Sequence, residues 1–385
     1  MLFCFILKEE VLVMKLLRVV ASYFKNCRDN FMIDLISKSK RTSEDKEYEL
    51  HEIDEGLYVY NTVAFVGKNA SGKTTAVELL DCCYSILGEF RVENKTYQYD
   101  HVTLDIIFYH EGMIYRYFTK LEADASLENK AVFTDQHIFQ KKYYKSRSKS
   151  VYDERDFKEM EDLGSLPEDT SIVFFVLKKK QTRALYFDSE GKGASTYQLL
   201  FKALRNYKIS TEVLADIIHI FDENICGLQM VDDNNYKLLY KAEQKIVSDT
   251  ELVHLLSSGT TKGILLYTMA AASLQMGFDL IIDEIENHFH KTLVENLISF
   301  YKDKMVNRNK AALLFTTHYC EVLDLFNRRD NIWISKSKEK VYLENMYENF
   351  DIRTELLKSN QFYSNAFDTA VNYEELMNLK RKLME

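Results

Sequence analysis

Apolar and polar positions divide the chain into short apolar runs separated by polar segments. Residues 15–24 and 61–66 have the β-branched and aromatic content of strands, and the second run is of the kind that a sheet buries on both faces. The polar residues 37–54 between them predict a loop or an exposed hairpin. From residue 73 to about residue 87 the apolar positions recur at helical spacing, which predicts a helix directly after the buried strand.

The middle of the chain is less regular. Apolar segments at 103–109 and 113–119 flank a His-Glu-Gly turn and predict a β-hairpin. Residues 121–170 are polar and irregular, and residues 171–176 predict a further strand. Two helices and a second hairpin are expected next, at residues 196–206, 211–223 and 228–240.

The last third of the chain alternates helix and strand. The expected order is helix 260–276, strand 279–283, helix 289–305, strand 311–316 and helix 319–326. Such alternation is typical of a parallel sheet that helices cover on both faces. We therefore predict an α/β fold with a parallel sheet flanked by helices.

Composition and charge narrow the class of protein. One proline and 12 glycines in 385 residues argue against flexible linkers between independent modules. The net charge of −9 argues against a broadly basic surface that coats nucleic acid, although a local patch stays possible. Six cysteines without CxxC spacing read as reduced packing thiols, so we expect no zinc site.

The sequence predicts no membrane contact and a cytoplasmic location. No apolar run approaches the ~18–20 residues that a transmembrane helix needs.

Lys8, Glu9 and Glu10 can be encoded by a purine-rich stretch that resembles a bacterial ribosome-binding site, so we expect Met14 to be the natural start.

Residues 67–74 read GKNASGKT, the Gly-x4-Gly-Lys-Thr pattern of a phosphate-binding loop. Its glycines allow backbone N–H groups to face phosphate oxygens, and the following helix directs its positive end at the same charge. Lys73 is expected to reach the β- and γ-phosphates of ATP, and Thr74 to place its hydroxyl on Mg²⁺. The candidate nucleotide-binding residues here are Gly67, Lys68, Asn69, Ala70, Ser71, Gly72, Lys73, Thr74 and Thr75.

Two later strands end in candidate catalytic residues, which would act with Lys73. Asp283 ends the apolar run LII and is expected to hold Mg²⁺ through water, with Glu284 as general base toward the attacking water. His318 follows the strand 311–316 and is a candidate sensor of the γ-phosphate. Taken alone, the acids suit a helix cap and the histidine suits simple solvation. Their order after a phosphate loop favours catalytic roles.

GKNASGKT, LSSGT at 256–260, LIIDE and TTH together resemble the ABC-type ATPases, and more closely their soluble SMC, RecF and OLD-like branch among bacterial AAA-family ATPases. LSSGT differs from the transporter signature LSGGQ at Ser258 and Thr260. The resemblance implies that Ser257, Ser258 and Gly259 of one chain contact the γ-phosphate held by a second chain, and hence an ATP-linked homodimer. An ordinary helix cap is the alternative for these residues.

Other stretches support the resemblance. EIENHFHKTL at 284–293 and RRDNIW at 328–333 resemble segments that these ATPases carry after the acidic strand. KLLRVVASYFKN at 15–26 resembles their first strand, which makes Arg18 or Lys25 a candidate nucleotide contact.

Two assignments lie where the resemblance is weaker. The glutamine that senses Mg²⁺ in the family falls in the poorly matching part of the chain, where Gln136 and then Gln140 are the candidates. His288 and His290 lie two residues apart, which on a helix points them to different sides, so we expect a structural dimer-contact role and no metal.

The resemblance implies an α/β P-loop NTPase fold of the ABC-ATPase head type, with a mixed sheet flanked by helices and an inserted helical or irregular lobe. No sustained heptads predict an SMC-type coiled coil, so the lobe should be compact. The expected division is an N-terminal lobe with the phosphate loop at 1–120, the inserted lobe at 121–250, a C-terminal lobe with signature, acidic strand and His318 at 251–345, and a helical tail at 346–385.

The expected function is ATP hydrolysis by a dimeric sensor or regulator in a bacterial anti-phage complex. Too few residues follow His318 for a fused TOPRIM nuclease, so the effector should be a separate nuclease or toxin. The alternatives are a RecF-type DNA-repair ATPase that binds DNA as an ATP-closed dimer, and a scaffold with little turnover. The basic aromatic run 141–149 suits nucleic acid, although a solvated loop balanced by nearby acids is the favoured interpretation.

Overall fold

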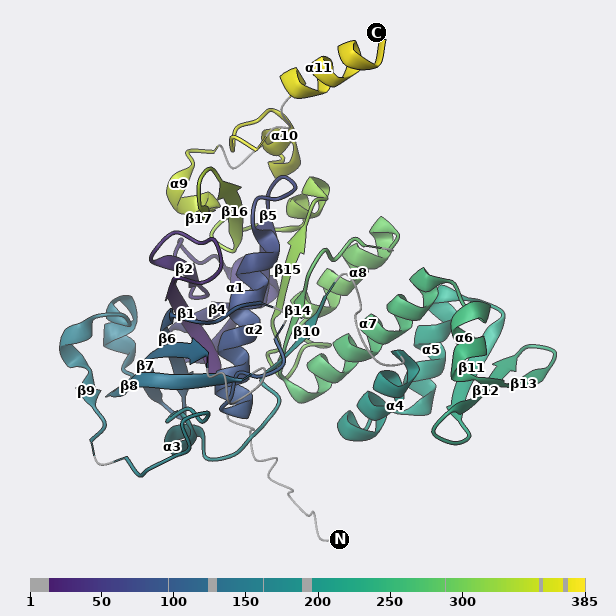
Figure 1. The fold of residues 1–385 in the computed structure, drawn as a ribbon, viewed down its shortest axis with the longest axis horizontal. Helices are drawn as coiled ribbons and strands as arrows, with labels where there is room; N and C mark the ends of the chain where they lie inside the picture. Colours follow the sequence, from purple (N-terminus) through teal and green to yellow (C-terminus); the bar gives the residue numbers. More distant parts are fainter. Residues whose placement is uncertain are drawn as a thin grey trace.

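The computed structural model describes residues 14–95, 97–123, 130–161, 163–188, 196–287, 289–352, 356–369 and 373–384. The expectations about residues 1–13 and about His288 lie outside these ranges, as does the side chain of Ser258. Two six-stranded sheets form the body, and a three-stranded sheet lies to one side (Figure 1). Within the described ranges, no helix combines the length and the apolar character that crossing a bilayer requires.

The central sheet is mixed, as predicted. Its order is β10 (Ala184–Phe187), β14 (Asp279–Ile282), β15 (Leu313–Thr317), β5 (Thr62–Val66), β16 (Ile332–Ser337) and β17 (Val341–Asn345). The first five strands run parallel, and β17 pairs antiparallel at the edge. Every residue of β5, β14 and β15 is buried, which explains why these strands read as continuous apolar runs.

Helices cover both faces of this sheet. Val63 and Phe65 of β5 pack with α2 (Lys73–Glu89) in one core, whereas Ala64 and Val66 pack in a second core. The second core also takes in the long helices α7 (Ser258–Met276) and α8 (Lys291–Lys302). Successive side chains of a strand point to opposite faces, so β5 fills both cores and the loop after it is held between them.

The second large sheet is antiparallel and packs against the other face of α2. Its order is β2 (Phe31–Asp34), β1 (Lys15–Ser22), β6 (Val102–His110), β7 (Met113–Ala123), β8 (Ala131–Lys142) and β9 (Lys158–Glu159). The strand at the N-terminus and the β6–β7 hairpin are confirmed. The prediction of irregular structure over 121–170 is wrong for β8, which is a long strand. Its outward-facing residues are polar, so its sequence lacks the apolar content that usually indicates a strand.

Two shorter expectations also need correction. Residues 171–176 do not form a strand, because the run turns into α3 (Phe174–Leu177) and buries Val173 and Leu177 under α2. Short apolar runs fit a helix turn as well as a strand. Of the loop or exposed hairpin expected over 37–54, a hairpin is found at the end of the range, where β3 (Leu50–Asp54) pairs with β4 (Leu57–Tyr60). The part before it forms α1 (Ser43–Tyr48), which was not expected and which Thr42 and Asp45 close with a capping box.

The remainder of the range 121–250 forms a lobe on α7. The expected helices and hairpin are confirmed as α4 (Thr196–Tyr207), α5 (Thr211–Phe221), β11 (Ile225–Met230) and β12 (Asn235–Tyr240), with β13 (Gln244–Ser248) and α6 (Asp249–Leu255) added. The range is therefore shared between the antiparallel sheet, the central sheet through β10, and this lobe, and the boundary expected at residue 120 falls inside β7.

The C-terminal part is helical, in short pieces. The helix expected at 319–326 is a 3₁₀ segment, η3 (Cys320–Leu325). It is followed, after β16 and β17, by α9 (Met346–Asn349), α10 (Lys358–Tyr363) and α11 (Tyr373–Met384). Figure 1 shows α11 standing away from the body, beyond the end of the central sheet where the phosphate loop lies.

A buried ion pair joins the two large sheets. Nζ of Lys15 on β1 lies 2.7 Å from Oδ1 of Asp279 on β14, and both side chains are almost fully buried. The hydroxyl of Tyr84 on α2 donates to the other carboxylate oxygen at 2.6 Å. Asp279 therefore ties the sheets and α2 together at the amino end of β14, opposite the edge where the phosphate loop lies.

Candidate nucleotide-binding site

The loop from Gly67 to Thr74 connects β5 to α2 and requires its glycines. Gly72 has a φ of +93° and caps α2 without a side-chain hydrogen bond, so the first N–H groups of the helix are not covered by a cap. A Cβ on Gly72 would lie 2.3 Å from Cγ1 of Val341, and one on Gly67 would lie 2.5 Å from the carbonyl oxygen of Ser335. The loop therefore forms a tight cradle of the kind that binds phosphate at a helix N-terminus.

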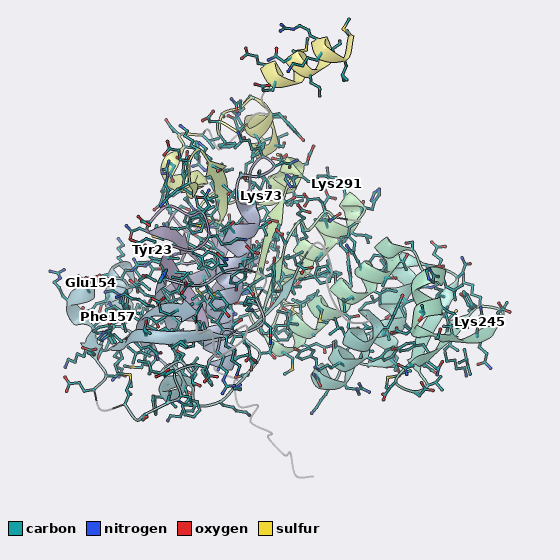
Figure 2. All side chains as sticks on the ribbon, viewed as in Figure 1. Tyr23, Lys73, Glu154, Phe157, Lys245 and Lys291 are labelled. Atoms are coloured by element: carbon teal, nitrogen blue, oxygen red, sulfur yellow. The ribbon has the colours of Figure 1, made fainter. Side chains whose placement is uncertain are left out.

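Lys73 lies at the upper end of α2 in Figure 2 and is almost fully buried. Its ammonium lies 3.1 Å from the carbonyl oxygen of Gly67, 3.2 Å from that of Lys68 and 3.3 Å from Nδ1 of His318. Burial lowers the pKa of the Lys73 ammonium, and nearby carboxylates oppose this shift, Glu286 most strongly. The structure thus brings Lys73 and His318 together, as the sequence predicts.

Asp283 meets the phosphate loop at the end of β14. Its Oδ2 accepts from the Thr74 hydroxyl at 2.9 Å, and its Oδ1 accepts from the Thr316 hydroxyl at 2.6 Å. Burial raises the pKa of the Asp283 carboxyl, and the two threonine hydroxyls oppose the rise. The donors offered by Thr74 and Asp283 are all oxygens, which is the ligand set that Mg²⁺ prefers. The predicted metal pair therefore fits Mg²⁺.

Glu284 is held in an unusual backbone conformation beside His318. Its φ of +51° lies in the left-handed region, which costs a non-glycine residue about 1–3 kcal/mol. Its backbone N–H donates to the Thr316 hydroxyl at 2.7 Å, and its Oε1 lies 3.7 Å from Nε2 of His318. One threonine at the end of β15 therefore orients both Asp283 and Glu284. Strain of this kind is typical of sites where a side chain must be aimed.

Glu286 is a site residue that sequence reasoning did not assign. It is buried, and its Oε1 accepts a hydrogen bond from the backbone N–H of His318. Its Oε2 is buried and has no hydrogen-bond partner among the described residues. Its carboxylate also has the largest charge effect on Lys73. The DE-x-E spacing after β14 carried this information, but only the fold shows that the third acid faces the same site.

The signature residues lie elsewhere in the chain. Ser257 is exposed and caps α7, accepting from the N–H of Thr260 at 3.0 Å, and Gly259 follows in the first turn. Figure 1 shows α6, which ends at Leu255 just before this cap, well apart from the end of α2 at which Figure 2 labels Lys73. The structure therefore does not bring Ser257, Ser258 and Gly259 to the phosphate loop of their own chain.

Gln136 is engaged away from the loop. Its Oε1 accepts from the hydroxyl of Tyr117 at 2.6 Å and from the N–H of Ile172 at 3.0 Å. These bonds tie β8 to β7 and to the turn before α3. The metal-sensing role expected for Gln136 is not supported, because the structure does not bring it to Thr74 and Asp283. Gln140 likewise lines a surface pocket of about 320 Å³ on the antiparallel sheet.

The side chains of Arg18 and Lys25, the two candidate nucleotide contacts near the N-terminus, interact with other residues of the chain. The guanidinium of Arg18 stacks on the ring of Tyr152, 4.2 Å from its centroid. Lys25 forms an ion pair with Glu78 on α2. Arg18 therefore serves the antiparallel sheet, while Lys25 joins the loop after β1 to the phosphate-loop helix.

The remaining motifs have structural roles. His290 caps α8 by accepting from the N–H of Thr292 at 3.3 Å, which agrees with a structural assignment. Arg328 of the RRDNIW stretch is buried and donates to Asp330 and to Asp45, each at 2.9 Å. This cluster joins α1 to the entry of β16.

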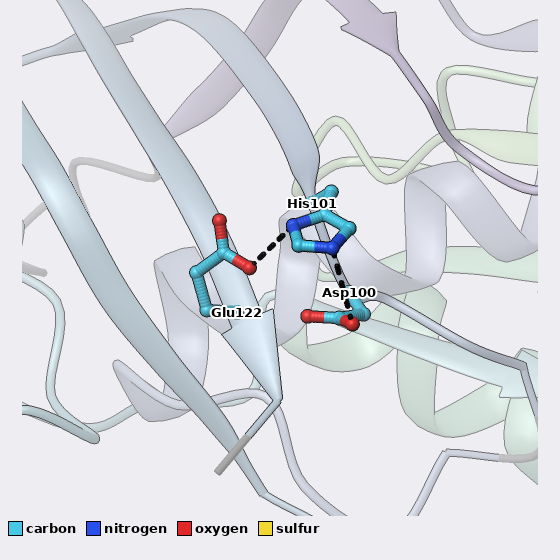
Figure 3. A group of neighbouring side chains, drawn as sticks. All are labelled: Asp100, His101 and Glu122. Carbon is cyan, nitrogen blue, oxygen red and sulfur yellow. Dashed lines mark ion pairs between the residues drawn. The ribbon is translucent and has the colours of Figure 1, made fainter.

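One further cluster of potential metal ligands lies at the surface (Figure 3). Nδ1 of His101 is 2.7 Å from Oε2 of Glu122, and its Nε2 is 3.6 Å from Oδ2 of Asp100. Each ring nitrogen faces a different carboxylate, and the cluster lies at the surface. We interpret the contacts as polar interactions between neighbouring surface residues.

Acids balance much of the basic run 141–149. Lys145 pairs with Glu55, and Nη1 of Arg147 lies 2.6 Å from Oδ2 of Asp156. Nζ of Lys141 donates to the carbonyl oxygen of Asp153 at 2.8 Å. The geometry therefore favours a folded, solvated loop over an open cationic groove.

Comparison with known proteins identifies the family. Residues 63–324, more than half of the chain, match the family described as "AAA domain, putative AbiEii toxin, Type IV TA system". The chain belongs to this AAA family. The matched part of the AAA domain contains the phosphate loop, Asp283, Glu284 and His318, and it is a P-loop ATPase domain.

Among solved structures, the AAA-family chain is similar to the one described as "Crystal structure of the SmcHead bound to the C-winged helix domain of ScpA". The identity is 10%, the TM-score is 0.42, and the alignment covers 86% of this chain and 98% of that chain. No curated protein sequence matches the chain.

Proposed function

We propose that this AAA-family chain binds ATP on the loop Gly67–Thr75 and hydrolyses it with Glu284 as the general base. The convergence of the loop, Asp283, Glu284 and His318 at one edge of the central sheet carries the proposal. Ligands of open α/β sheets bind outside the carboxyl ends of the strands, and β5, β14 and β15 end at this edge.

Each residue then has a distinct chemical role. Lys73 would neutralise charge on the β- and γ-phosphates, and Glu284 would accept a proton from the attacking water. Mg²⁺, held by Thr74 and Asp283, would polarise the phosphate oxygens. His318 contacts both Lys73 and Glu284, so it connects phosphate binding to the base.

We propose that the site is completed by a second copy. Ser257 and Gly259 lie at the exposed N-terminus of α7, whose partial positive charge suits a phosphate. They are remote from the loop of their own chain, which leaves a second chain as the one to receive them. ATP would then link two copies into a homodimer with two shared sites.

We further propose that the dimer regulates a separate effector, such as a nuclease or toxin, in the cytoplasm of a bacterium defending itself against phage. The family description reads "putative AbiEii toxin, Type IV TA system", which supports a place in a toxin–antitoxin or defence system. The DNA-clamp alternative has less support, because ion pairs with Glu55 and Asp156 balance the basic run 141–149.

Phosphate release from purified protein with Mg²⁺-ATP tests the enzymatic part. We expect turnover by the unmodified chain and a loss of at least about 10²-fold in Glu284→Gln, because the base is removed while the fold is kept. Glu243→Gln, at an exposed acid on the lobe, is the matched control and should leave turnover unchanged. Equal rates in all three proteins would contradict the assignment.

A further inference from the structure

The C-terminal helix α11 has apolar side chains that the rest of the described chain leaves uncovered. Leu379 is 53% exposed, Leu383 is 78% exposed and Met384 is 77% exposed. Figure 1 shows the helix projecting from the body. Apolar residues gathered on one exposed helix mark an interaction surface.

The segment before α11 is fixed to the nucleotide edge of the molecule. On α10, the N–H of Ser359 donates to Oδ1 of Asp324 at 3.0 Å, and the hydroxyl of Tyr363 donates to Glu321. Both acids belong to η3, which begins two residues after His318. The segment α10, which precedes α11, is therefore held against η3, the element that follows His318 in the chain.

The charges of α11 point to a second copy as its partner. The first turn is acidic, with Glu374 and Glu375, and the last turn is basic, with Arg381 and Lys382. Two parallel copies would place like charges level with each other, whereas two antiparallel copies place acidic turns against basic turns. An antiparallel pair therefore sets acidic turns against basic turns at both ends, whereas a parallel pair aligns turns of like charge.

The heptad register of the sequence agrees with this arrangement. Leu376, Leu379 and Leu383 follow one another at three and four residues, the spacing of the a and d positions of a coiled coil. Glu375 and Lys382 then both occupy g positions, on the same flank of this seam. In an antiparallel pair, g positions face g positions, so Glu375 opposes Lys382 of the partner subunit, and two-fold symmetry repeats the contact.

We propose that α11 pairs antiparallel with α11 of a second copy and so reinforces the nucleotide-linked dimer. The inference rests on the proposed dimer for its biological setting. A helix of 12 residues is about 18 Å long and covers less than the ~800 Å² per partner of a stable interface. The pairing is therefore weak alone and becomes effective when ATP already holds the two heads together.

Cysteine cross-linking across the two-fold axis tests the pairing without relying on turnover. Leu379→Cys is introduced with Cys226→Ser, which removes the exposed cysteine among the described residues. We expect a covalent dimer on mild oxidation, formed faster with Mg²⁺-ATP. Ile246→Cys, at a site 63% exposed on the lobe, is the matched control and should cross-link only by collision.

Charge reversal in the cross-linking protein tests the direction of the pairing. Glu375→Lys alone and Lys382→Glu alone should each slow cross-linking roughly tenfold, because two attractions become repulsions. The double variant should regain the original rate, and an equal mixture of the two single variants about half of it, because about half of the pairs are then mixed. In a parallel pair Glu375 would instead face Lys380 of the partner subunit. The lysine introduced by Glu375→Lys would then repel that lysine in both copies, and the double variant would keep the slow cross-linking rate.

The outcomes separate this proposal from the nucleotide-linked dimer. Normal ATP-dependent dimers in sedimentation without cross-linking at position 379 would overturn the pairing of α11 and leave the shared site standing. Cross-linking that responds to charge reversal but not to ATP would support the pairing and count against the nucleotide link. Mixtures that cross-link no faster than either single variant would overturn the antiparallel arrangement.

Discussion

Nζ of Lys73 lies 3.3 Å from Nδ1 of His318, although 245 residues separate them in the sequence. An ammonium can only donate, so Nδ1 accepts and the ring proton lies on Nε2. Nε2 faces Oε1 of Glu284 at 3.7 Å. A line of three side chains thus runs from the lysine of the phosphate loop to the proposed base.

Glu284→Gln should stop turnover and preserve the ATP-bound dimer. Glutamine keeps the size and the hydrogen bonds of the side chain but cannot accept the proton from water, so the rate should fall by about 10²–10⁴-fold. Sedimentation with ATP should show dimers that persist longer than those of the unmodified chain. Rapid return to monomers, or normal hydrolysis, would show that Glu284 is not the base.

Glu286→Gln should move the alkaline limb of the pH profile. Glutamine can still accept from the N–H of His318, but the carboxylate that most strongly supports the charge of Lys73 is lost. The pKa of Lys73 should fall, so kcat/KM for ATP should decline at lower pH than in the unmodified enzyme. If the alkaline limb stays at the same pH, Glu286 does not support the charge of Lys73 and has a structural role only.

The phosphate site was predictable because its parts are local. β5, the glycine loop and α2 follow one another without interruption, and the acids follow directly after the buried strand β14. Thr316 could not be assigned in this way, and Glu286 only in part. The DE-x-E spacing places Glu286 shortly after β14, but its contact with His318 depends on β14 and β15 lying side by side, as does the role of Thr316.

The errors also have physical causes. Residue type and approximate position point to Gln136, and nothing local shows that Tyr117 and Ile172 donate to its amide oxygen. Polar residues cover the outer face of β8, so its sequence resembles a loop, and the short apolar run at α3 has no period that separates helix from strand.

Acid should destabilise the fold through His51. Burial, above all, lowers the pKa of His51 to about 3, and its Nε2 lies 3.1 Å from the carbonyl oxygen of Ala311. The folded pKa lies below the unfolded value of about 6.5, so protons bind the unfolded chain first as the pH falls. The contribution of neutral His51 to the free energy of unfolding is therefore complete above pH 6.5 and is lost as the pH falls toward 3.

The free energy of unfolding should therefore fall by about 2 kcal/mol between pH 7 and pH 5 from this residue alone. Denaturant unfolding of the unmodified chain and of His51→Gln at the two pH values measures the difference. His254→Gln, at an exposed histidine, is the control and should keep the full pH dependence. An equal dependence in His51→Gln would contradict the role of His51.

Removing one partner of the ion pair between the sheets should lower the free energy of unfolding more than removing both. Asp279→Ala leaves the buried ammonium of Lys15 without its partner, which should lower the free energy of unfolding by about 3–5 kcal/mol. Adding Lys15→Met should recover part of this loss, because no uncompensated charge is left. A double-mutant cycle measures the coupling, and strictly additive losses would rule out the pair as a unit.

The shared site is tested most directly by complementation between two inactive variants. Lys73→Ala removes the phosphate contact, and Ser257→Arg blocks the signature, so neither protein should hydrolyse ATP alone. A mixed dimer contains one complete site, formed by the intact loop of one chain and the intact signature of the other. An equal mixture should regain about a quarter of the unmodified rate, since half of the dimers are mixed and each has one complete site of two. A mixture as inactive as its components would contradict a site built from two chains.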